Sequence, residues 1–362
     1  MKDHIMSYEE SISSKDIALE LFNVQLAIDK QEILQALTFD IVEGEILCLL
    51  GPSGCGKTTA LKAIAGLSIP QKGQISLFGD TVFSEQKINQ APEERSIGFI
   101  FQDYALFPHM TVGQNIAYGL PHLDKPARQL RIRESLELVE LATLEHRYPH
   151  ELSGGQQQRI AVARALAPKP KLLLMDEPFS NIDGQVKRRM MADLRQLLKK
   201  HNISCIFVTH AKDEAFAFAD KTAVMVNGRI EQLDIPAKVF NNPNTLAVAE
   251  FMECGNLATL KHSQQVLDRI SNQWPRDIDN SGYWLFKPQY LVLSHSFQNT
   301  GVTLIDSTYI GRGYQHEIAI SLTKNNQGST ITWKAETEAP LGIAVGENIA
   351  LEYEQMPHWL QN

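Results

Sequence analysis

A glycine-rich run, GPSGCGKTT, begins at Gly51 and constrains the fold of this chain more than any other feature. The apolar segment EILCLL comes directly before it, and the helix-forming segment KTTALKAIAGL overlaps its end. A strand that leads through a glycine-rich loop into a helix is the context of a phosphate-binding loop, because backbone N–H groups and the positive end of the helix then face one anion. The pattern therefore predicts a buried strand at 45–50 and a phosphate site where that strand ends.

The residue types of this loop suit a nucleotide. Glycines let the backbone curl around phosphate oxygens. Lys57 is predicted to reach the β- and γ-phosphates, and the hydroxyl of Thr58 to coordinate Mg²⁺. We interpret Cys55 as a small filler of the loop, and its position beside Lys57 and a helix N-terminus favours a reactive thiolate, since both features lower a thiol pKa. The residues assigned to nucleotide binding here are Gly51, Pro52, Ser53, Gly54, Cys55, Gly56, Lys57, Thr58 and Thr59.

A second motif, KLLLMDEP, places two acids after an apolar run. Asp176 and Glu177 follow a predicted buried strand, and the carboxyl ends of parallel strands are where sites form in α/β proteins. Asp176 suits Mg²⁺, directly or through a water, and Glu177 is the candidate general base for an attacking water. Two adjacent acids can also form an ordinary solvated turn, but the nearby phosphate loop favours the catalytic interpretation.

Strand-like and helical segments alternate over residues 16–245, which predicts an α/β domain with a parallel sheet. Residues 110–165 are mostly helical and form a predicted subdomain. Residues 1–15 read as a loose tail. Short β-rich runs such as GYWLFKP, YLVLSH and STITWKAE fill 246–362, which is typical of a small antiparallel barrel or sandwich.

Composition narrows the functional classes. The 362 residues are 43% hydrophobic and 21% charged, as in ordinary folded soluble proteins. A net charge of −8 argues against nucleic acid as the main partner, because phosphate neutralisation needs a basic face. We predict no signal peptide, and no run approaches the roughly 18 apolar residues that span a bilayer. The scattered cysteines, four in number, fit a reducing cytoplasm.

The octapeptide LSGGQQQR, residues 152–159, is a small polar loop that runs into a helix-forming segment. Ser153 is a good N-cap for that helix. Gly154 and Gly155 leave the backbone bare, which allows close approach of another group. The sequence itself offers no obvious ligand for this loop.

Taken together, residues 16–240 resemble the ATP-binding subunits of ABC transporters. GPSGCGKT corresponds to the Walker A motif of that family, LLLMDE to Walker B and LSGGQ to the signature. Gln102 in IFQDYALFPHMTV matches the Q-loop, Asp183 in SNID the D-loop and His210 in IFVTH the switch histidine. The six motifs stand in family order. The resemblance implies a P-loop NTPase nucleotide-binding domain with ATP and Mg²⁺ as its ligands.

The same resemblance implies roles for these residues. Two copies of the domain face each other head to tail, and the signature loop of one completes the ATP site of the other. His210 would contact the γ-phosphate and hold the attacking water, and Gln102 would contact Mg²⁺ or that water. Asp183 would also lie at the nucleotide. The signature residues assigned to the shared site are Ser153, Gly154, Gly155 and Gln156.

Two further positions follow from the resemblance. Ile28 stands where family members usually carry an aromatic ring that stacks on adenine, so we expect loose binding of the base, unless another ring such as Phe22 replaces it. The loop after Gln102 would border a groove for a helix of the membrane partner. The side chains expected to line that groove are Tyr104, Leu106, Phe107 and Pro108.

The β-rich end resembles the OB-like regulatory domain of importer ATPases. Lys287-Pro288-Gln289 stands where Arg-Pro-Glu is common, so a role for those side chains is in doubt. This domain is either a ligand sensor or a dimerisation module. The phrase YPHELSGGQQQRIAVARALAP is most similar to ferric-iron importers, although no residue here reads the cargo, and sulfate, molybdate, polyamine or sugar remain open.

The implied protein is a homodimeric ATPase at the cytoplasmic face of the bacterial inner membrane. It would sit beneath transmembrane permease subunits, supplied indirectly by a periplasmic substrate-binding protein. A soluble, non-transport ABC ATPase is the alternative of another class, but such proteins usually carry two cassettes or a long coiled-coil insertion. A P-loop kinase would lack LSGGQ.

Overall fold

The computed structural model describes residues 17–86, 88–180, 182, 184–259, 282–296, 300–322, 330–354 and 358–361. The chain divides into two compact units, Met1–Ala237 and Lys238–Asn362. The sequence places this division after residue 245, whereas the structure places it within helix α7 (Pro236–Asn241). The predicted tail, 1–15, lies outside the described residues.

The first unit is built around a six-stranded sheet in the order β11-β10-β3-β9-β8-β7. Neighbouring strands are parallel from β10 to β7, and only β11 runs antiparallel to its neighbour. Strands β3, β8 and β9 are buried along their whole length, as their apolar sequences predict. The bounds are β3 (Ile46–Leu50), β7 (Ile97–Ile100), β8 (Leu172–Asp176), β9 (Ser204–Thr209), β10 (Lys221–Val226) and β11 (Arg229–Asp234). The predicted parallel α/β sheet is confirmed.

A second sheet of the first unit is antiparallel, in the order β2-β1-β4-β5-β6, and the sequence analysis did not predict it. Register shifts interrupt the pairing of β1 with β2, so that a simple alternation of apolar residues is lost. Leu19, Leu21 and Ile75 of this sheet share one hydrophobic core with Leu47 and Leu49 of the parallel sheet. The bounds are β1 (Ile17–Ile28), β2 (Gln31–Val42), β4 (Lys72–Leu77), β5 (Asp80–Ser84) and β6 (Ile88–Asn89).

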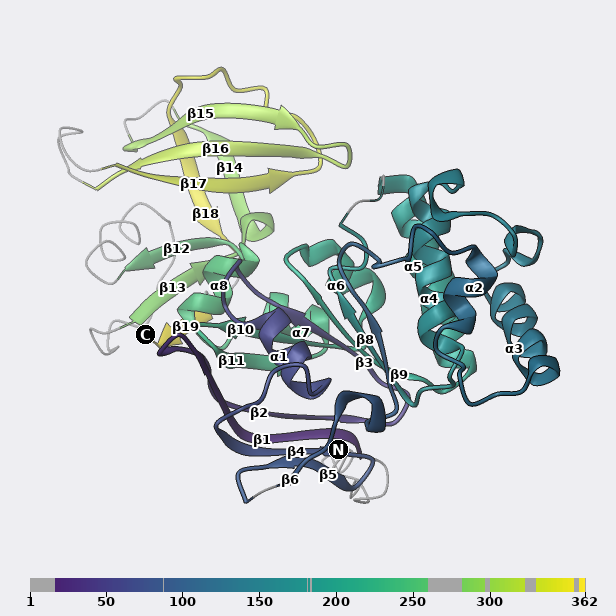
Figure 1. Ribbon diagram of the computed structural model, residues 1–362. Coiled ribbons are helices and arrows are strands. Elements are labelled where there is room, and N and C mark those ends of the chain that lie inside the picture. The colour runs from purple at the N-terminus through teal and green to yellow at the C-terminus, as the bar shows by residue number, and fades with distance from the viewer. Residues whose placement is uncertain are drawn as a thin grey trace, which may run out of the picture. The chain divides into compact units, whose positions relative to one another are not determined.

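Helices of the first unit follow the predicted pattern. Helix α1 leaves the glycine-rich loop, while α2 and α3 pack on α4, and Figure 1 shows these three beside α5, away from α1. The α-helices are α1 (Lys57–Ile64), α2 (Val112–Ala117), α3 (Lys125–Leu138), α4 (Gly154–Leu166), α5 (Gly184–Lys200) and α6 (Lys212–Phe218). The 3₁₀ turns are η2 (Pro92–Glu94), η3 (Ala142–Leu144) and η4 (Pro149–Glu151).

The second unit is β-rich, as its sequence predicts. Its antiparallel strands form three small sheets, β12-β13-β19, β14-β18 and β15-β16-β17, around a core that includes Phe286, Trp333 and Tyr353. The strands are β12 (Asn256–Thr259), β13 (Gly282–Phe286), β14 (Leu291–His295), β15 (Val302–Tyr309), β16 (Tyr314–Ser321), β17 (Thr330–Thr337), β18 (Ile349–Tyr353) and β19 (His358–Gln361). Helix α8 (Leu246–Met252) precedes them, and η5 (Pro288–Tyr290) joins β13 to β14.

Within the described parts of both units, no helix is long and apolar enough to cross a membrane.

Candidate functional site

Four adjacent parallel strands, β3, β9, β8 and β7, end at the same edge of the central sheet. The glycine-rich loop follows β3. Gln102, Glu177 and His210 follow β7, β8 and β9 within two residues of the strand ends. Side chains that are distant in the sequence therefore meet at one edge, because parallel strands present their carboxyl ends together.

The glycine-rich loop encloses the ammonium group of Lys57. Its Nζ donates to the carbonyl oxygens of Gly51 and Pro52, both at 2.8 Å, and lies 3.8 Å from the Sγ of Cys55. The Lys57 residue is only 7% exposed. A buried cation held by two loop carbonyls is ready to exchange those neutral acceptors for an anion, since charge-assisted hydrogen bonds are stronger than neutral ones.

Glycine is favoured at two positions of the loop for different reasons. A Cβ on Gly51 would lie 2.1 Å from the carbonyl oxygen of Met225, so no larger residue fits there. Gly54 has φ of +81° and a Cβ on it would meet nothing within 4 Å, which leaves open space above the backbone. Pro52, Ser53 and Gly54 are exposed, whereas Thr58 and Thr59 are half-buried at the start of α1. The loop is thus closed on its β10 side and open on the other, as a phosphate cradle requires.

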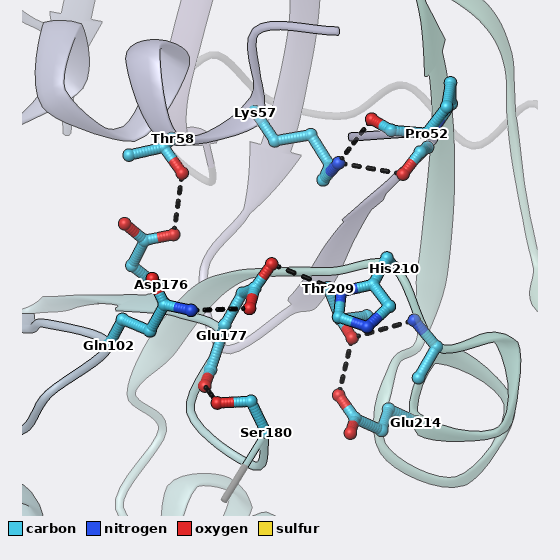
Figure 2. Close-up of polar contacts among 12 residues, drawn as sticks. Pro52, Lys57, Thr58, Gln102, Asp176, Glu177, Ser180, Thr209, His210 and Glu214 are labelled. Atoms are coloured by element: carbon cyan, nitrogen blue, oxygen red, sulfur yellow. Dashed lines mark hydrogen bonds and ion pairs between the residues drawn. The ribbon is translucent and has the colours of Figure 1, made fainter. Parts of the chain in front are cut away.

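Thr58 and Asp176 form the predicted pair for a divalent cation. The Thr58 Oγ1 donates to Asp176 Oδ1 at 2.9 Å, and Asp176 is only 7% exposed (Figure 2). Burial raises the pKa of the Asp176 carboxyl, although the hydrogen bond from Thr58 partly opposes that shift. A hydroxyl and a buried carboxylate are oxygen ligands of the kind that Mg²⁺ prefers, so these residues fit the ion.

Glu177 is held at both oxygens of its carboxylate. Gln102 Nε2 donates to Oε2 at 2.9 Å, and His210 Nδ1 lies 3.2 Å from Oε1 (Figure 2). Glu177 itself has φ of +44°, an uncommon conformation for a non-glycine residue. Three residues predicted to be catalytic are therefore in direct contact. Gln102, predicted as a metal ligand as well, bonds here to Glu177 through its amide nitrogen.

Glu214 is a site residue that the sequence analysis missed. Its Oε2 accepts from Thr209 Oγ1 at 2.6 Å, and its Oε1 accepts from Lys187 Nζ at 2.8 Å. Thr209 Oγ1 in turn accepts from the backbone N–H of Ala211 at 3.0 Å, so the turn that presents His210 is fixed from both sides. No local pattern marks Glu214, because its partners lie on β9 and α5.

The signature loop begins helix α4. Ser153 Oγ accepts from the Gln156 N–H at 3.3 Å, and Gln156 Oε1 accepts from the Ser153 N–H at 3.0 Å. This is a complete capping box, and it confirms Ser153 as the N-cap. A Cβ on Gly154 would meet nothing within 4 Å among the described residues, and one on Gly155 would only touch Val186 at 3.9 Å. The outer face of the loop is therefore uncovered.

Two expectations need correction. Burial raises the pKa of the Cys55 thiol, and this effect outweighs the opposing effect of Lys57, so the thiolate is disfavoured. Tyr104 is buried rather than part of an open groove: its hydroxyl lies 3.5 Å from Gln158 Oε1, and Arg164 holds its carbonyl oxygen at 2.8 Å. Leu106 is half-buried.

The remaining predicted residues are those expected near the base, Ile28 and Phe22, and Asp183 of the D-loop. Ile28 ends β1 opposite Gln31 and is 48% exposed. Phe22 lies earlier on the same strand, pairs with Gln74 and is 63% exposed. Asp183 lies outside the described residues.

Comparison with known proteins agrees with this geometry. The family model described as "ABC transporter" matches residues 34–180. A "Fe(3+) ions import ATP-binding protein FbpC" of Escherichia coli O157:H7 is 38% identical over 304 residues, which are 82% of this chain and 86% of that protein. A "Spermidine/putrescine import ATP-binding protein PotA" of Vibrio cholerae is 43% identical over 251 residues, 68% of this chain and 65% of that protein.

A similar solved structure is a dimeric, post-hydrolysis state of an ATP-binding cassette bound to ADP and Pi. It is 29% identical, covers 60% of this chain and 98% of that chain, and superposes with a TM-score of 0.53.

Proposed function

This chain belongs to the family of ABC transporter ATP-binding proteins, and from that premise we propose that it is the ATP-hydrolysing subunit of a bacterial importer. One observation supports the proposal above all others. Within one sheet edge, Lys57 lies in a glycine-rich loop, Thr58 contacts Asp176, and Glu177 is oriented by Gln102 and His210. Phosphate binding, cation binding and water activation are thus available side by side.

The phosphate end of ATP is bound by the loop and by Lys57, whose ammonium leaves the carbonyls of Gly51 and Pro52 for the phosphate oxygens. Thr58 and Asp176 would hold Mg²⁺. When bound, this ion neutralises charge that develops on the β- and γ-phosphate oxygens. A cation held there would also offset the free-energy cost of burying the charged Asp176 carboxylate.

Glu177 takes a proton from the attacking water. The contacts at its two oxygens keep the carboxylate oriented, and each oxygen retains a second lone pair that can accept a hydrogen bond from the attacking water. His210 is 59% exposed at its side chain and is therefore free to turn toward the γ-phosphate. Through its hydrogen bond to Glu177, Gln102 connects the catalytic carboxylate to the loop that continues toward Tyr104.

A second copy of the chain supplies the other half of each site. The uncovered face of Ser153, Gly154 and Gly155 offers a hydroxyl, bare backbone N–H groups and the N-terminus of the 13-residue helix α4. These groups suit phosphate oxygens. The similar cassette bound to ADP and Pi is dimeric. Asp183 and Gln156 belong to the same proposed interface.

We assign ferric iron as the transported substrate. The support is the iron-import relative, which aligns with 82% of this chain and so extends into the second unit. The polyamine relative aligns with less of the chain. Transmembrane permease subunits and a periplasmic substrate-binding protein complete the proposed importer, with this subunit peripheral at the cytoplasmic face of the inner membrane. Residues 246–362, within the second unit, serve as an OB-like regulatory or dimerisation domain.

Co-purification tests the proposal against a soluble ABC ATPase. The tagged full chain is isolated from mildly solubilised membranes of its host, with the Lys57→Ala variant as a control for the transport assay. We expect permease subunits to co-purify, and reconstituted vesicles to take up Fe³⁺ only with ATP and unmutated Lys57. An active ATPase that captures no membrane protein would support the soluble alternative, and uptake of sulfate or a polyamine instead of Fe³⁺ would contradict only the assigned cargo.

A further inference from the structure

Arg159 ends the octapeptide LSGGQQQR and lies in helix α4, which Ser153 caps. At about 1.5 Å of rise per residue, Arg159 lies roughly 9 Å along the helix axis from that cap. It is therefore outside the loop that faces a second copy, yet it belongs to the same short helix. A contact that fixes Arg159 also fixes the direction in which α4 presents the signature loop.

The guanidinium of Arg159 joins α4 to two other helices. Its Nη1 donates to the carbonyl oxygen of Val139 at 3.2 Å and to Glu140 Oε2 at 3.3 Å, and its Nη2 donates to Asp193 Oδ2 at 2.9 Å. Val139 is the C-cap of α3, where the helix dipole favours a cation, and Asp193 lies on α5. Only a planar group with several donors can hold both partners at once, so a lysine could not replace this arginine.

The seam between α4 and α5 is incompletely filled on both sides of this contact. A hollow of about 200 Å³ lies between the signature loop and the start of α5, and another of about 320 Å³ lies among the ends of α3, α4 and α5. Arg159 and Met190 line both hollows. Close packing, which usually fixes one helix against another, is thus reduced here, and the charged contact to Asp193 sets the separation of the two helices.

We propose that Arg159 is a positioning residue for the nucleotide site of the second copy, and that its contact with Asp193 holds the signature loop in place to meet the γ-phosphate bound there. The inference rests on the proposed shared site. Arg159 touches no phosphate and acts only through α4. Because a displacement of about 1 Å in a catalytic site can cost roughly 100-fold in rate, loss of this contact should impair the partner's site and spare the chain's own phosphate loop.

Asp193→Ala tests the contact from its α5 side. The Asp193 side chain is 45% exposed and alanine is the best helix former, so the variant should fold. We expect ATPase activity to fall by about ten-fold or more, while binding of labelled ATP to the monomer is unchanged. Gln196→Ala changes an exposed residue that lines the same hollow on the same helix, and this matched control should keep wild-type activity. Wild-type activity in Asp193→Ala would overturn the inference.

Mixed dimers distinguish a displaced signature loop from a general defect. With Lys57→Ala, the Asp193→Ala chain contributes an intact phosphate loop to an intact signature loop, so an equimolar, randomly paired mixture should reach about a quarter of wild-type activity. With Ser153→Arg, the displaced signature loop must complete the site, and a ten-fold defect leaves only about a twentieth of wild-type activity. Equal rescue by both partners, rescue by neither, or the opposite order would overturn the role of Arg159.

A mixture of Lys57→Ala with Ser153→Arg separates this inference from the function on which it rests. If that mixture regains activity while Asp193→Ala shows no preference between the two partners, only the role of Arg159 is wrong. If that mixture stays inactive, the proposed shared site itself is wrong, and the inference is overturned with it.

Discussion

The two glycine-rich loops of the first unit differ in what surrounds them. In the phosphate loop, Lys57 bonds to two carbonyls of its own loop and Gly51 has Met225 against it. In the signature loop, the side chains of Ser153 and Gln156 bond to each other's backbone, and Gly154 faces open space among the described residues. One loop is completed by its own chain. The other has the chemistry of a phosphate site without a partner, which is why we assign it to the nucleotide of a second copy.

The largest effect is expected at the catalytic carboxylate, which lies in the half-site that a single chain forms around its own phosphate loop. Glu177→Gln keeps the size of the side chain but removes the proton acceptor, so hydrolysis should fall by about 10²–10⁴-fold. ATP should still bind, and because the step that opens the dimer is lost, the variant should elute as a dimer in ATP. Size-exclusion chromatography with and without Mg²⁺-free ATP checks this. Wild-type turnover, or a monomer in ATP, would disprove the role of Glu177.

The next effect is on the loop that faces outward. Ser153→Arg fills the uncovered face, so ATPase activity should fall by about 100-fold or more, as for loss of an oxyanion donor, while labelled-ATP binding to the monomer changes little. Ser153→Thr keeps both the hydroxyl and the helix cap and serves as the control. Loss of monomer binding by Ser153→Arg would place the loop at its own nucleotide and remove the contrast between the two loops.

A smaller effect concerns the cation pair. Thr58→Val removes the hydroxyl that contacts Asp176 without a large change in volume. We expect the Mg²⁺ concentration for half-maximal ATPase activity to rise by about ten-fold, because a weaker ligand set needs more free ion, and Thr58→Ser to restore it. A titration of activity against Mg²⁺ measures both variants. An unchanged midpoint for Thr58→Val would exclude Thr58 as a ligand.

The smallest effect is at the base. Ile28→Tyr adds a ring at the exposed end of β1, and base–aromatic stacking contributes roughly 1–3 kcal/mol. ATP should therefore bind at least about five-fold more tightly, the factor for roughly 1 kcal/mol, whereas Ile28→Leu should change little. Titration with labelled ATP decides the question. Strong wild-type preference for ATP with no gain from the tyrosine would mean that the base is already stacked elsewhere.

The sequence predicts best where a function depends on adjacent residues. The phosphate loop, the acids after β8 and the Ser153 cap all consist of neighbouring residues whose chemistry is local, and the structure brings Gln102, Glu177 and His210 together as parallel strands require. The β-rich character of the second unit also follows from local patterns.

The sequence analysis failed where contacts between residues that are distant in the sequence determine the structure or the pKa of a side chain. Bulges in β1 and β2 obscured the antiparallel sheet, and Glu214 is recognisable only once β9 and α5 are packed together. For Cys55, the sequence shows the nearby positive charge but not the burial that outweighs it. Tyr104 lies in an apolar cluster that suggested a groove for a partner, yet its side chain is buried in the interior.

Mixing two inactive variants tests the shared site most directly. Ser153→Arg retains an intact phosphate loop, and Lys57→Ala retains an intact signature loop, so a mixed dimer contains one complete site. If dimers form at random in an equimolar mixture, half are mixed and each has half its sites, and ATPase activity should reach about a quarter of wild type. Activity that never exceeds that of the two parents would show that each chain completes its own site, and would contradict the account.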